Sequence, residues 1–274
     1  MIDCHIHTNT SEDSKMTVMD ACKQAVECGL KYICFTNHHE IPEMKNSNFN
    51  FSLDGNKFLD YKKAVEQARK EFPELKISFG CEIGHMEEYK DEIKEFLDEH
   101  DFDFVLGSIH WMVLPDGKAD LVSDRAIASM EKHGRDAYMK VYARSIVESI
   151  NSGLYDSISH IGMFTRFIPD FDFSNYDKEL NDIVEAFKNS KTGIEINTWR
   201  GKFPKGYWNP PSTLVKAVFN TGNPILTVGS DAHETGSVGK GIKEVLQFAK
   251  TCGYEKVAFF EKRKPLFLDI DKLI

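Results

Sequence analysis

Short apolar segments alternate with longer amphipathic segments along most of this chain. The short segments are rich in β-branched and aromatic residues, which is typical of buried strands. We expect strands at residues 2–6, 31–36, 76–81, 103–109, 156–161, 193–197 and 225–230, with a further candidate at 256–260. The longer segments carry apolar residues at helical spacing, which predicts helices at 17–28, 58–72, 87–99, 124–151, 177–190, 211–221 and 239–252.

Strands separated by helices are typical of β–α units around a parallel sheet. Seven or eight such units in 274 residues favour a closed barrel over an open sheet. We therefore expect an α/β fold in which residues 1–274 form a single (β/α) barrel domain. Two long polar stretches, 41–57 and 198–211, interrupt the alternation. Loops of this length inside a compact domain are usually functional.

The bulk composition narrows the classes of function. Hydrophobic residues make up 41% of the chain and charged residues 28%, as in ordinary globular proteins. The net charge of −9 argues against a basic surface for nucleic acid polymers. An acidic protein that binds an anionic substrate must therefore gather positive charge locally, in metal ions or in a few arginines.

The sequence gives no sign of a membrane span or a targeting segment. No apolar stretch approaches the roughly 18 to 20 residues that a spanning helix needs, and nothing resembles a signal peptide. The cysteines form no C-x-x-C pair, and we expect free thiols in a reducing, cytoplasmic environment. They are Cys4, Cys22, Cys28, Cys34, Cys81 and Cys252.

Histidines collect at the ends of the predicted strands. His5 and His7 share a face of the first strand, because alternate side chains of a strand point the same way. Of ten histidines, only His100 and His133 lie in charged helical segments. In a barrel the carboxyl ends of the strands meet at one rim, where active sites are built. The candidates at this rim are His5, His7, His38, His39, His85, His110, His160 and His233, with Glu40, Glu82, Glu195 and Asp231.

A set of imidazoles and carboxylates at one rim indicates a transition-metal site, although any single member, such as His160, is also explained as a hydrogen-bonded core residue. The candidates outnumber the ligands of one tetrahedral zinc. We therefore expect two or three divalent ions (Zn, Mn or Fe), with a carboxylate bridging two of them. Such a cluster lowers the pKa of bound water and stabilises charge on oxygen, which favours hydrolysis of phosphate esters.

The order of these motifs resembles the PHP (polymerase and histidinol phosphatase) superfamily. The motifs are DCHIHT, TNH, the segment around Glu82, GSIH, SHIG and GSDAH, and they extend from residue 3 to residue 233. The chain length and the sequences EINT and SDAH make the protein similar to the monofunctional histidinol-phosphate phosphatases of that superfamily. The resemblance implies a distorted (β/α)7 barrel that holds three metal ions at the carboxyl ends of its strands.

The resemblance also implies, position by position, which residues bind each ion. The first ion would be bound by His5, His7, Glu82 and Asp231; the second by Glu82, His110 and His160; the third by His38, His233 and Asp13. Many relatives have a histidine where this chain has Asp13, so a carboxylate there implies a harder ion or a weaker site. The alternative for Asp13 is a loop or capping residue. His39 would point away from His38.

Two arginines and one glutamate are the candidates for binding substrate. Arg166 and Arg200 follow the fifth and sixth predicted strands, and arginine binds phosphate in a bidentate manner. Glu195 would either support a ligand side chain or accept a substrate amine. Asp231 or His233 would protonate the leaving group, and the sequence does not choose between them.

These features favour a phosphomonoesterase that hydrolyses L-histidinol phosphate to L-histidinol and phosphate, a step of histidine biosynthesis. Its expected partner is a small phosphorylated substrate rather than a nucleic acid polymer or a membrane, and the sequence does not predict an oligomeric state. Two alternatives stay open. The site could serve another small phosphate monoester, such as a nucleotide, or the chain could be a metal-binding module of this superfamily without catalysis.

Overall fold

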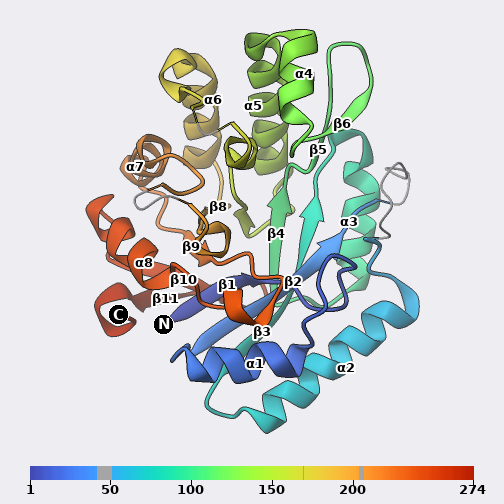
Figure 1. The fold of residues 1–274 in the computed structure, drawn as a ribbon, viewed down its shortest axis with the longest axis vertical. Helices are drawn as coiled ribbons and strands as arrows, with labels where there is room; N and C mark the ends of the chain where they lie inside the picture. The colour runs from blue at the N-terminus through green and yellow to red at the C-terminus, as the bar shows by residue number, and fades with distance from the viewer. Residues whose placement is uncertain (42–50, 169, 204–206) are drawn as a thin grey trace.

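The protein is described here by a computed structural model that covers residues 1–41, 51–168, 170–203 and 207–274. Seven strands form one parallel sheet in the order β1-β2-β3-β4-β7-β8-β9 (Figure 1). Their bounds are β1 (Ile2–Ile6), β2 (Tyr32–His39), β3 (Lys76–Gly84), β4 (Phe104–Ser108), β7 (Ser157–Ile158), β8 (Gly193–Asn197) and β9 (Leu226–Gly229). Nearly every residue of these strands is buried, as expected when both faces of a parallel sheet are covered.

The two end strands of this sheet meet just beyond the end of β9. Ile6 of β1 forms an isolated parallel bridge with Ala232. The backbone N–H of His7 donates to the carbonyl of Ala232 at 2.8 Å, and that of Asp231 donates to the carbonyl of His5 at 2.9 Å. The sheet is thus nearly closed, which confirms the predicted α/β barrel. That residues 1–274 form a single domain stays a prediction.

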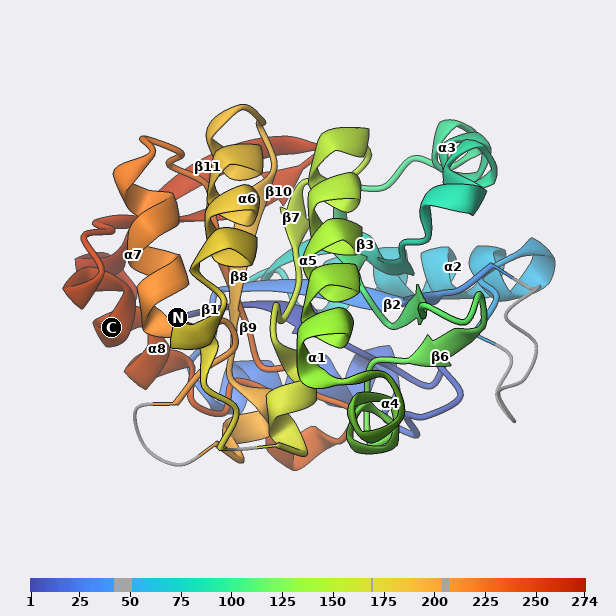
Figure 2. The ribbon, with the colours of Figure 1, turned by 90° about the horizontal axis from the view of Figure 1, so that it is seen from above.

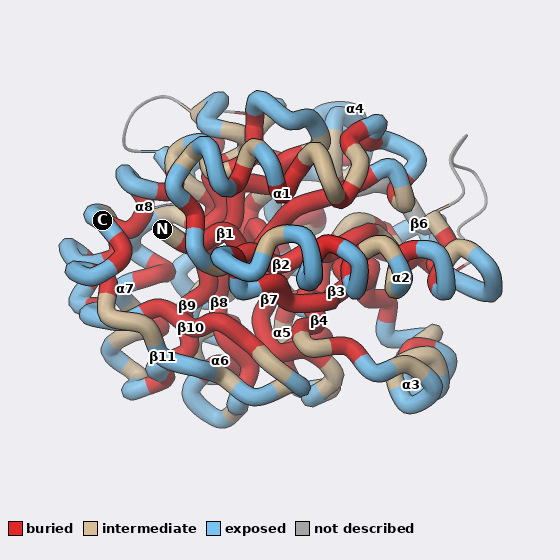
Figure 3. Tube along the Cα trace, turned by 90° about the horizontal axis from the view of Figure 1, so that it is seen from below, coloured by how far each residue is buried: buried red, intermediate tan, exposed pale blue. Residues whose placement is uncertain are grey.

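Helices lie around the barrel, and burial falls from the strands outward (Figures 2 and 3). The start of helix α1 is capped by Thr17, whose hydroxyl accepts from the N–H of Asp20 at 3.1 Å and donates to the Asp20 carboxylate at 2.6 Å. The helices are α1 (Val18–Glu27), α2 (Gly55–Glu71), α3 (Lys90–Glu99), α4 (Ala126–His133), α5 (Arg135–Ser152), α6 (Asp177–Lys188), α7 (Ser212–Asn220) and α8 (Ile242–Thr251).

Two local predictions are wrong, and a third, the strand at 256–260, is confirmed as a strand but lies outside the barrel sheet. The helix expected at 124–151 is two helices, because Gly134 (φ 86°, ψ 144°) ends α4 and begins α5. The strand expected at 156–161 ends at Ile158, and His160 has a positive φ of 23°. The segment 256–260 is a strand, but it pairs in an antiparallel hairpin, β10 (Lys256–Glu261) with β11 (Lys264–Asp269), outside the barrel sheet.

A second hairpin, β5 (Trp111–Val113) with β6 (Ala119–Leu121), was not expected from the sequence. The loop predicted at 41–57 is shorter than expected because α2 begins at Gly55, and its residues 42–50 lie outside the described part. Residues 204–206 of the second predicted loop do so too. Among the described residues, the structure contains no helix with the length and apolar character needed to cross a bilayer.

Candidate metal centre

Glu82 lies at the centre of the carboxyl-end rim of the barrel, and its side chain is fully buried. It sits on β3 directly opposite His38 of β2 in the sheet register. Ser108 of the next strand donates its hydroxyl to Glu82 Oε1 at 2.6 Å. Five imidazoles bring a nitrogen within 3.3 Å of the Glu82 oxygens: His5, His7 and His38 at Oε2, and His110 and His160 at Oε1.

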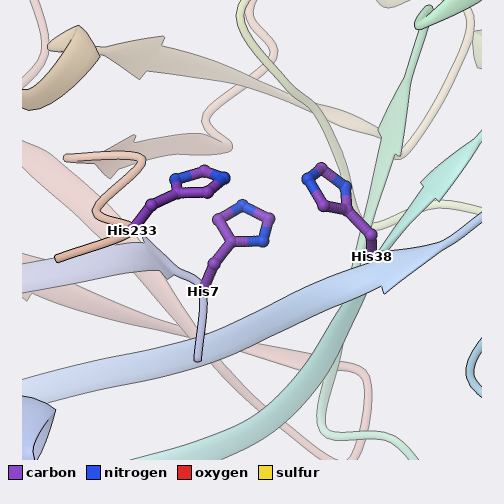
Figure 4. A group of neighbouring side chains, drawn as sticks. All are labelled: His7, His38 and His233. Carbon is purple, nitrogen blue, oxygen red and sulfur yellow. The ribbon is translucent and has the colours of Figure 1, made fainter. Parts of the chain in front are cut away.

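Asp13 lies on the outer side of this cluster, beside the imidazoles of His38 and His233. Its Oδ2 is 2.8 Å from Nε2 of His233 and 3.5 Å from Nε2 of His38. Figure 4 shows His7, His38 and His233 facing one another, with the rings of His7 and His233 stacked 4.1 Å apart. The carboxylate that departs from the family pattern therefore lies beside both of its expected co-ligands.

Asp231 completes the group on the side of β1. Its Oδ1 lies 3.6 Å from Nε2 of His7 and 3.8 Å from Nε2 of His5. Those two imidazole nitrogens are themselves 2.9 Å apart. The structure thus brings together all the residues of the predicted ligand set: His5, His7, Asp13, His38, Glu82, His110, His160, Asp231 and His233.

Lone pairs on nitrogen and oxygen atoms converge in this cluster, as a cation-binding site requires. Ionised Glu195 accepts from Nδ1 of His5 at 2.7 Å, so Nε2 of a neutral His5 is a bare lone pair that faces further acceptors. Among the described residues, the buried atoms Glu82 Oε2 and His38 Nδ1 have no hydrogen-bond partner, although they lie 3.1 Å apart. Convergent acceptors of nitrogen and oxygen type suit zinc and similar ions.

The electrostatics of the cluster favour ionised carboxylates. Burial alone would raise the pKa of Glu82, but the imidazoles of His5 and His110 outweigh burial and hold this pKa well below its usual range. Burial lowers the pKa of His5, yet Glu195 and Glu82 raise it well above its ordinary value. Without ions, His5, His38 and His110, whose pKa values are all raised by neighbouring carboxylates, therefore carry protons that metal binding would release.

Both arginines predicted from the sequence adjoin Asp231. Arg166 Nη2 lies 3.0 Å from Asp231 Oδ2 and donates to Asn197 Oδ1 at 3.0 Å. The Arg166 guanidinium also stacks 5.6 Å from the ring centre of Trp199. Arg200, in a left-handed backbone conformation with φ of 59°, donates its Nε to the carbonyl oxygen of Asp231 at 2.9 Å. Positive charge is thus concentrated at one edge of the cluster.

Glu195 uses both of its oxygens inside the protein. Its Oε1 is 2.7 Å from Nδ1 of His5. Its Oε2 accepts from the backbone N–H of His160 at 2.9 Å and from Asn197 Nδ2 at 3.1 Å. The side chain is fully buried. These contacts favour the role of supporting His5 over that of accepting a substrate amine.

Two histidines of the rim turn away from the cluster. His39 stacks on Phe96, with ring centres 3.7 Å apart, and its Nδ1 accepts from the N–H of Leu53 at 3.0 Å, as expected for the outward member of its pair. His85 places Nδ1 2.9 Å from the hydroxyl of Tyr155. Both are structural residues of the surrounding layer.

Glu40 is the residue whose role the sequence reasoning missed. Its Oε1 lies 2.6 Å from Nδ1 of His110, on the side opposite Glu82. The signal was present in the sequence: Glu40 is two residues after His38, and alternate residues of an extended chain share a face.

The comparison with known families decides the identity of this barrel. The family model for the PHP domain matches residues 3–199. The chain belongs to the PHP domain family. Its PHP barrel is similar over nearly its whole length to curated relatives. A probable histidinol-phosphatase of Clostridium acetobutylicum is 29% identical over 271 residues, which cover 96% of this chain and 98% of the relative.

A second relative of this PHP protein is known by sequence and also by structure. The histidinol-phosphatase of Lactococcus lactis is 26% identical over 268 residues, covering 96% of this chain and 95% of that protein. A crystal structure of the histidinol phosphate phosphatase of Lactococcus lactis, in complex with zinc, L-histidinol and phosphate, aligns with a TM-score of 0.79 and 24% identity. The alignment covers 97% of this chain and 98% of that one. This likeness shows that the two proteins share a fold.

Proposed function

We propose that the protein is a metal-dependent phosphomonoesterase that hydrolyses L-histidinol phosphate to L-histidinol and phosphate. The observation that carries the proposal is the buried cluster around Glu82, with Arg166 and Arg200 beside it at Asp231. The names of the relatives that match over nearly their full length support this substrate.

The cluster is suited to hold two or three divalent ions, and the zinc in the Lactococcus lactis structure supports zinc as one of them. When bound, such ions make hydroxide available at neutral pH and stabilise charge on phosphate oxygens. The proposed ligands keep the grouping implied by the family: His5, His7, Glu82 and Asp231; Glu82, His110 and His160; and His38, His233 and Asp13.

The chain's own contribution to the reaction begins with the arginines. Arg166 is held in place by Asp231, Asn197 and the ring of Trp199, so its guanidinium is oriented before substrate arrives. Arg200 is anchored through its Nε, which donates to the carbonyl oxygen of Asp231. Fixed cations that face the phosphoryl oxygens stabilise the charge that spreads over them in the transition state.

Asp231 and His233 are the two candidates for protonating the leaving oxygen. Burial would raise the pKa of Asp231, but Arg166 and the imidazole of His5 outweigh it and hold this pKa far below its ordinary value. Asp231 is therefore ionised at neutral pH in this form of the protein. The cytoplasmic location expected from the six cysteines, which are all free thiols, stays a prediction.

The direct test is phosphate release from L-histidinol phosphate by purified protein loaded with zinc, manganese or iron. Elemental analysis of the same sample gives the metal content, and His110→Ala is expected to abolish turnover while leaving the fold intact. A faster reaction with a nucleoside monophosphate would assign another monoester as substrate. Metal binding without hydrolysis of any monoester in the panel would identify a non-catalytic module.

A further inference from the structure

Glu40 is a buried carboxylate fixed against His110. It directly follows β2, its side chain is 9% exposed, and its Oε1 lies 2.6 Å from Nδ1 of His110. The backbone N–H of Glu40 donates to the carbonyl of Phe51 at 3.1 Å, so both the backbone and the side chain of Glu40 are held by hydrogen bonds. An ionised carboxylate only accepts, so Nδ1 of His110 carries a hydrogen. In the neutral, metal-binding form of His110 the lone pair is then on Nε2, which faces Glu82 Oε1 at 3.3 Å.

Gly84 leaves the space that this carboxylate occupies. A Cβ atom at Gly84 would lie 1.9 Å from Oε2 of Glu40 and 2.6 Å from its Cδ. Gly84 is not among the residues with positive φ, so its backbone conformation does not itself require glycine. The reason for glycine at this point of β3 is therefore the approach of Glu40.

The same arrangement occurs on the other side of Glu82. Glu195 Oε1 lies 2.7 Å from Nδ1 of His5, whose Nε2 faces Glu82 Oε2 at 3.3 Å. There too a glycine of the neighbouring strand makes room, because a Cβ at Gly229 would lie 2.2 Å from Cβ of His5 and 2.5 Å from Glu195 Oε1. Histidines that bind metals commonly donate their second ring N–H to a carboxylate, which fixes the tautomer and the ring orientation.

We propose that Glu40 is a positioning residue of the metal centre: it holds His110 so that Nε2 points at the ion shared with Glu82 and His160, and Gly84 provides its space. This inference rests on the metal centre of the proposed function. Glu40 acts through His110: its Oε1 contacts Nδ1, the ring nitrogen on the side opposite Glu82, and its Oε2 lies against Gly84. It is not part of the ligand set implied by the family resemblance.

The test measures retention of zinc rather than activity. Purified variants are titrated with a chelator, and native mass spectrometry reports how many ions remain at each chelator concentration. Glu40→Ala and Gly84→Ala are each expected to lose one ion at about 10- to 100-fold lower chelator concentration than the wild type. Glu40→Gln keeps an acceptor oxygen for Nδ1 and is expected to stay within about tenfold of the wild type.

A matched control removes a carboxylate that lies beside a histidine outside the cluster. Glu87 Oε2 is 3.6 Å from Nε2 of His85, and Glu87→Gln is expected to leave zinc retention unchanged. Because Glu40 acts through His110, adding Glu40→Ala to His110→Ala should change the remaining zinc affinity by less than about twofold. Circular dichroism of every variant reports whether the barrel has folded.

Three outcomes would overturn the inference. If a folded Glu40→Ala variant retains zinc as tightly as the wild type, Glu40 does not position a ligand. If Glu40→Gln is as weak as Glu40→Ala, the carboxylate is itself a ligand. If the wild type binds no zinc at all, the metal centre of the proposed function fails first, and this inference fails with it.

Discussion

Glu195 joins two candidate ligands through one carboxylate: its Oε1 lies 2.7 Å from Nδ1 of His5, and its Oε2 accepts the backbone N–H of His160 at 2.9 Å. All three residues are buried. The carboxylate therefore connects the end of β1, through His5, with the turn after β7, through His160.

Replacing Glu195 with glutamine should weaken this centre. The amide offers one acceptor oxygen, so either His5 or His160 would face an NH₂ group in place of an acceptor. We expect zinc affinity to fall about 10- to 100-fold and the free energy of unfolding to fall by about 1–3 kcal/mol. Chelator competition and urea unfolding measure the two effects.

A suitable control for Glu195→Gln is Ser157→Ala, which removes a buried hydrogen bond of 2.9 Å to Thr227 between strands of the same sheet. It should lower stability slightly and leave zinc affinity unchanged. Wild-type zinc affinity in Glu195→Gln would show that His5 needs no support from this carboxylate.

Arg166 is expected to matter more for turnover than for folding. Arg166→Lys keeps the charge but loses the planar guanidinium, which contacts Asp231 and Asn197 through Nη2 and lies over the ring of Trp199. We expect kcat/KM for L-histidinol phosphate to fall about 100- to 1000-fold in Arg166→Ala and somewhat less in Arg166→Lys. Steady-state kinetics at saturating zinc measure both.

The comparison for Arg166 is Arg144→Ala, which removes an arginine whose side chain is 62% exposed on α5. Kinetic constants close to the wild type are expected there. A less than threefold change in Arg166→Ala would remove this residue from the substrate site.

Much of the site could be predicted because its chemistry lies at strand ends. Side chains alternate along a strand, so His5 and His7 share a face. A barrel brings all strand ends to one rim, and together these two rules place the ligands near one another. The sequence places Glu40 on the same face as His38, but the supporting roles of Glu40 and Glu195 depend on which side of an imidazole each carboxylate approaches, and the sequence pattern does not show this. Gly84 and Gly229 leave the space that each carboxylate occupies, and the sequence does not show which residues lie against these glycines in the fold.

The buried strands of the barrel could be predicted from their apolar sequences. The pairing of a strand or the end of a helix could not be predicted where it depends on the conformation of a turn. The segment 256–260 has the apolar character of a barrel strand but belongs to the β10–β11 hairpin. Its turn is made by Lys262 and Arg263, with φ of 49° and 60°, and lacks the Asn-Gly or Asp-Gly pair that announces such turns in a sequence. Likewise a single glycine, Gly134, divides a continuous helical pattern in two.

Removal of metal should destabilise the whole barrel. Ions that bind only the folded state add about 4 kcal/mol when present at a thousand times their dissociation constant. We therefore expect a chelator to lower the Tm of the wild type by roughly 10 °C, and added zinc to restore it. In Glu82→Ala, which lacks the central carboxylate, the chelator should shift the Tm much less. An unchanged wild-type Tm would argue against ions at this site.

His85 should make stability depend on pH. Burial lowers the pKa of His85 to about 4, an effect that Lys90 adds to and Glu87 opposes. Between pH 4 and pH 6.5 the unfolded chain therefore binds a proton that the folded protein excludes, so stability falls as the pH falls. For this group, the loss from pH 7 to pH 5 is up to about 2 kcal/mol.

His85→Asn tests this directly, because asparagine can still accept from Tyr155 but does not titrate in this range. Urea unfolding at pH 7 and pH 5 should show a smaller loss of stability in the variant than in the wild type, by up to about 2 kcal/mol. The histidines of the metal centre are present in both proteins and cancel in the comparison. Equal losses in the two proteins would mean that folded His85 takes up a proton as readily as the unfolded chain does.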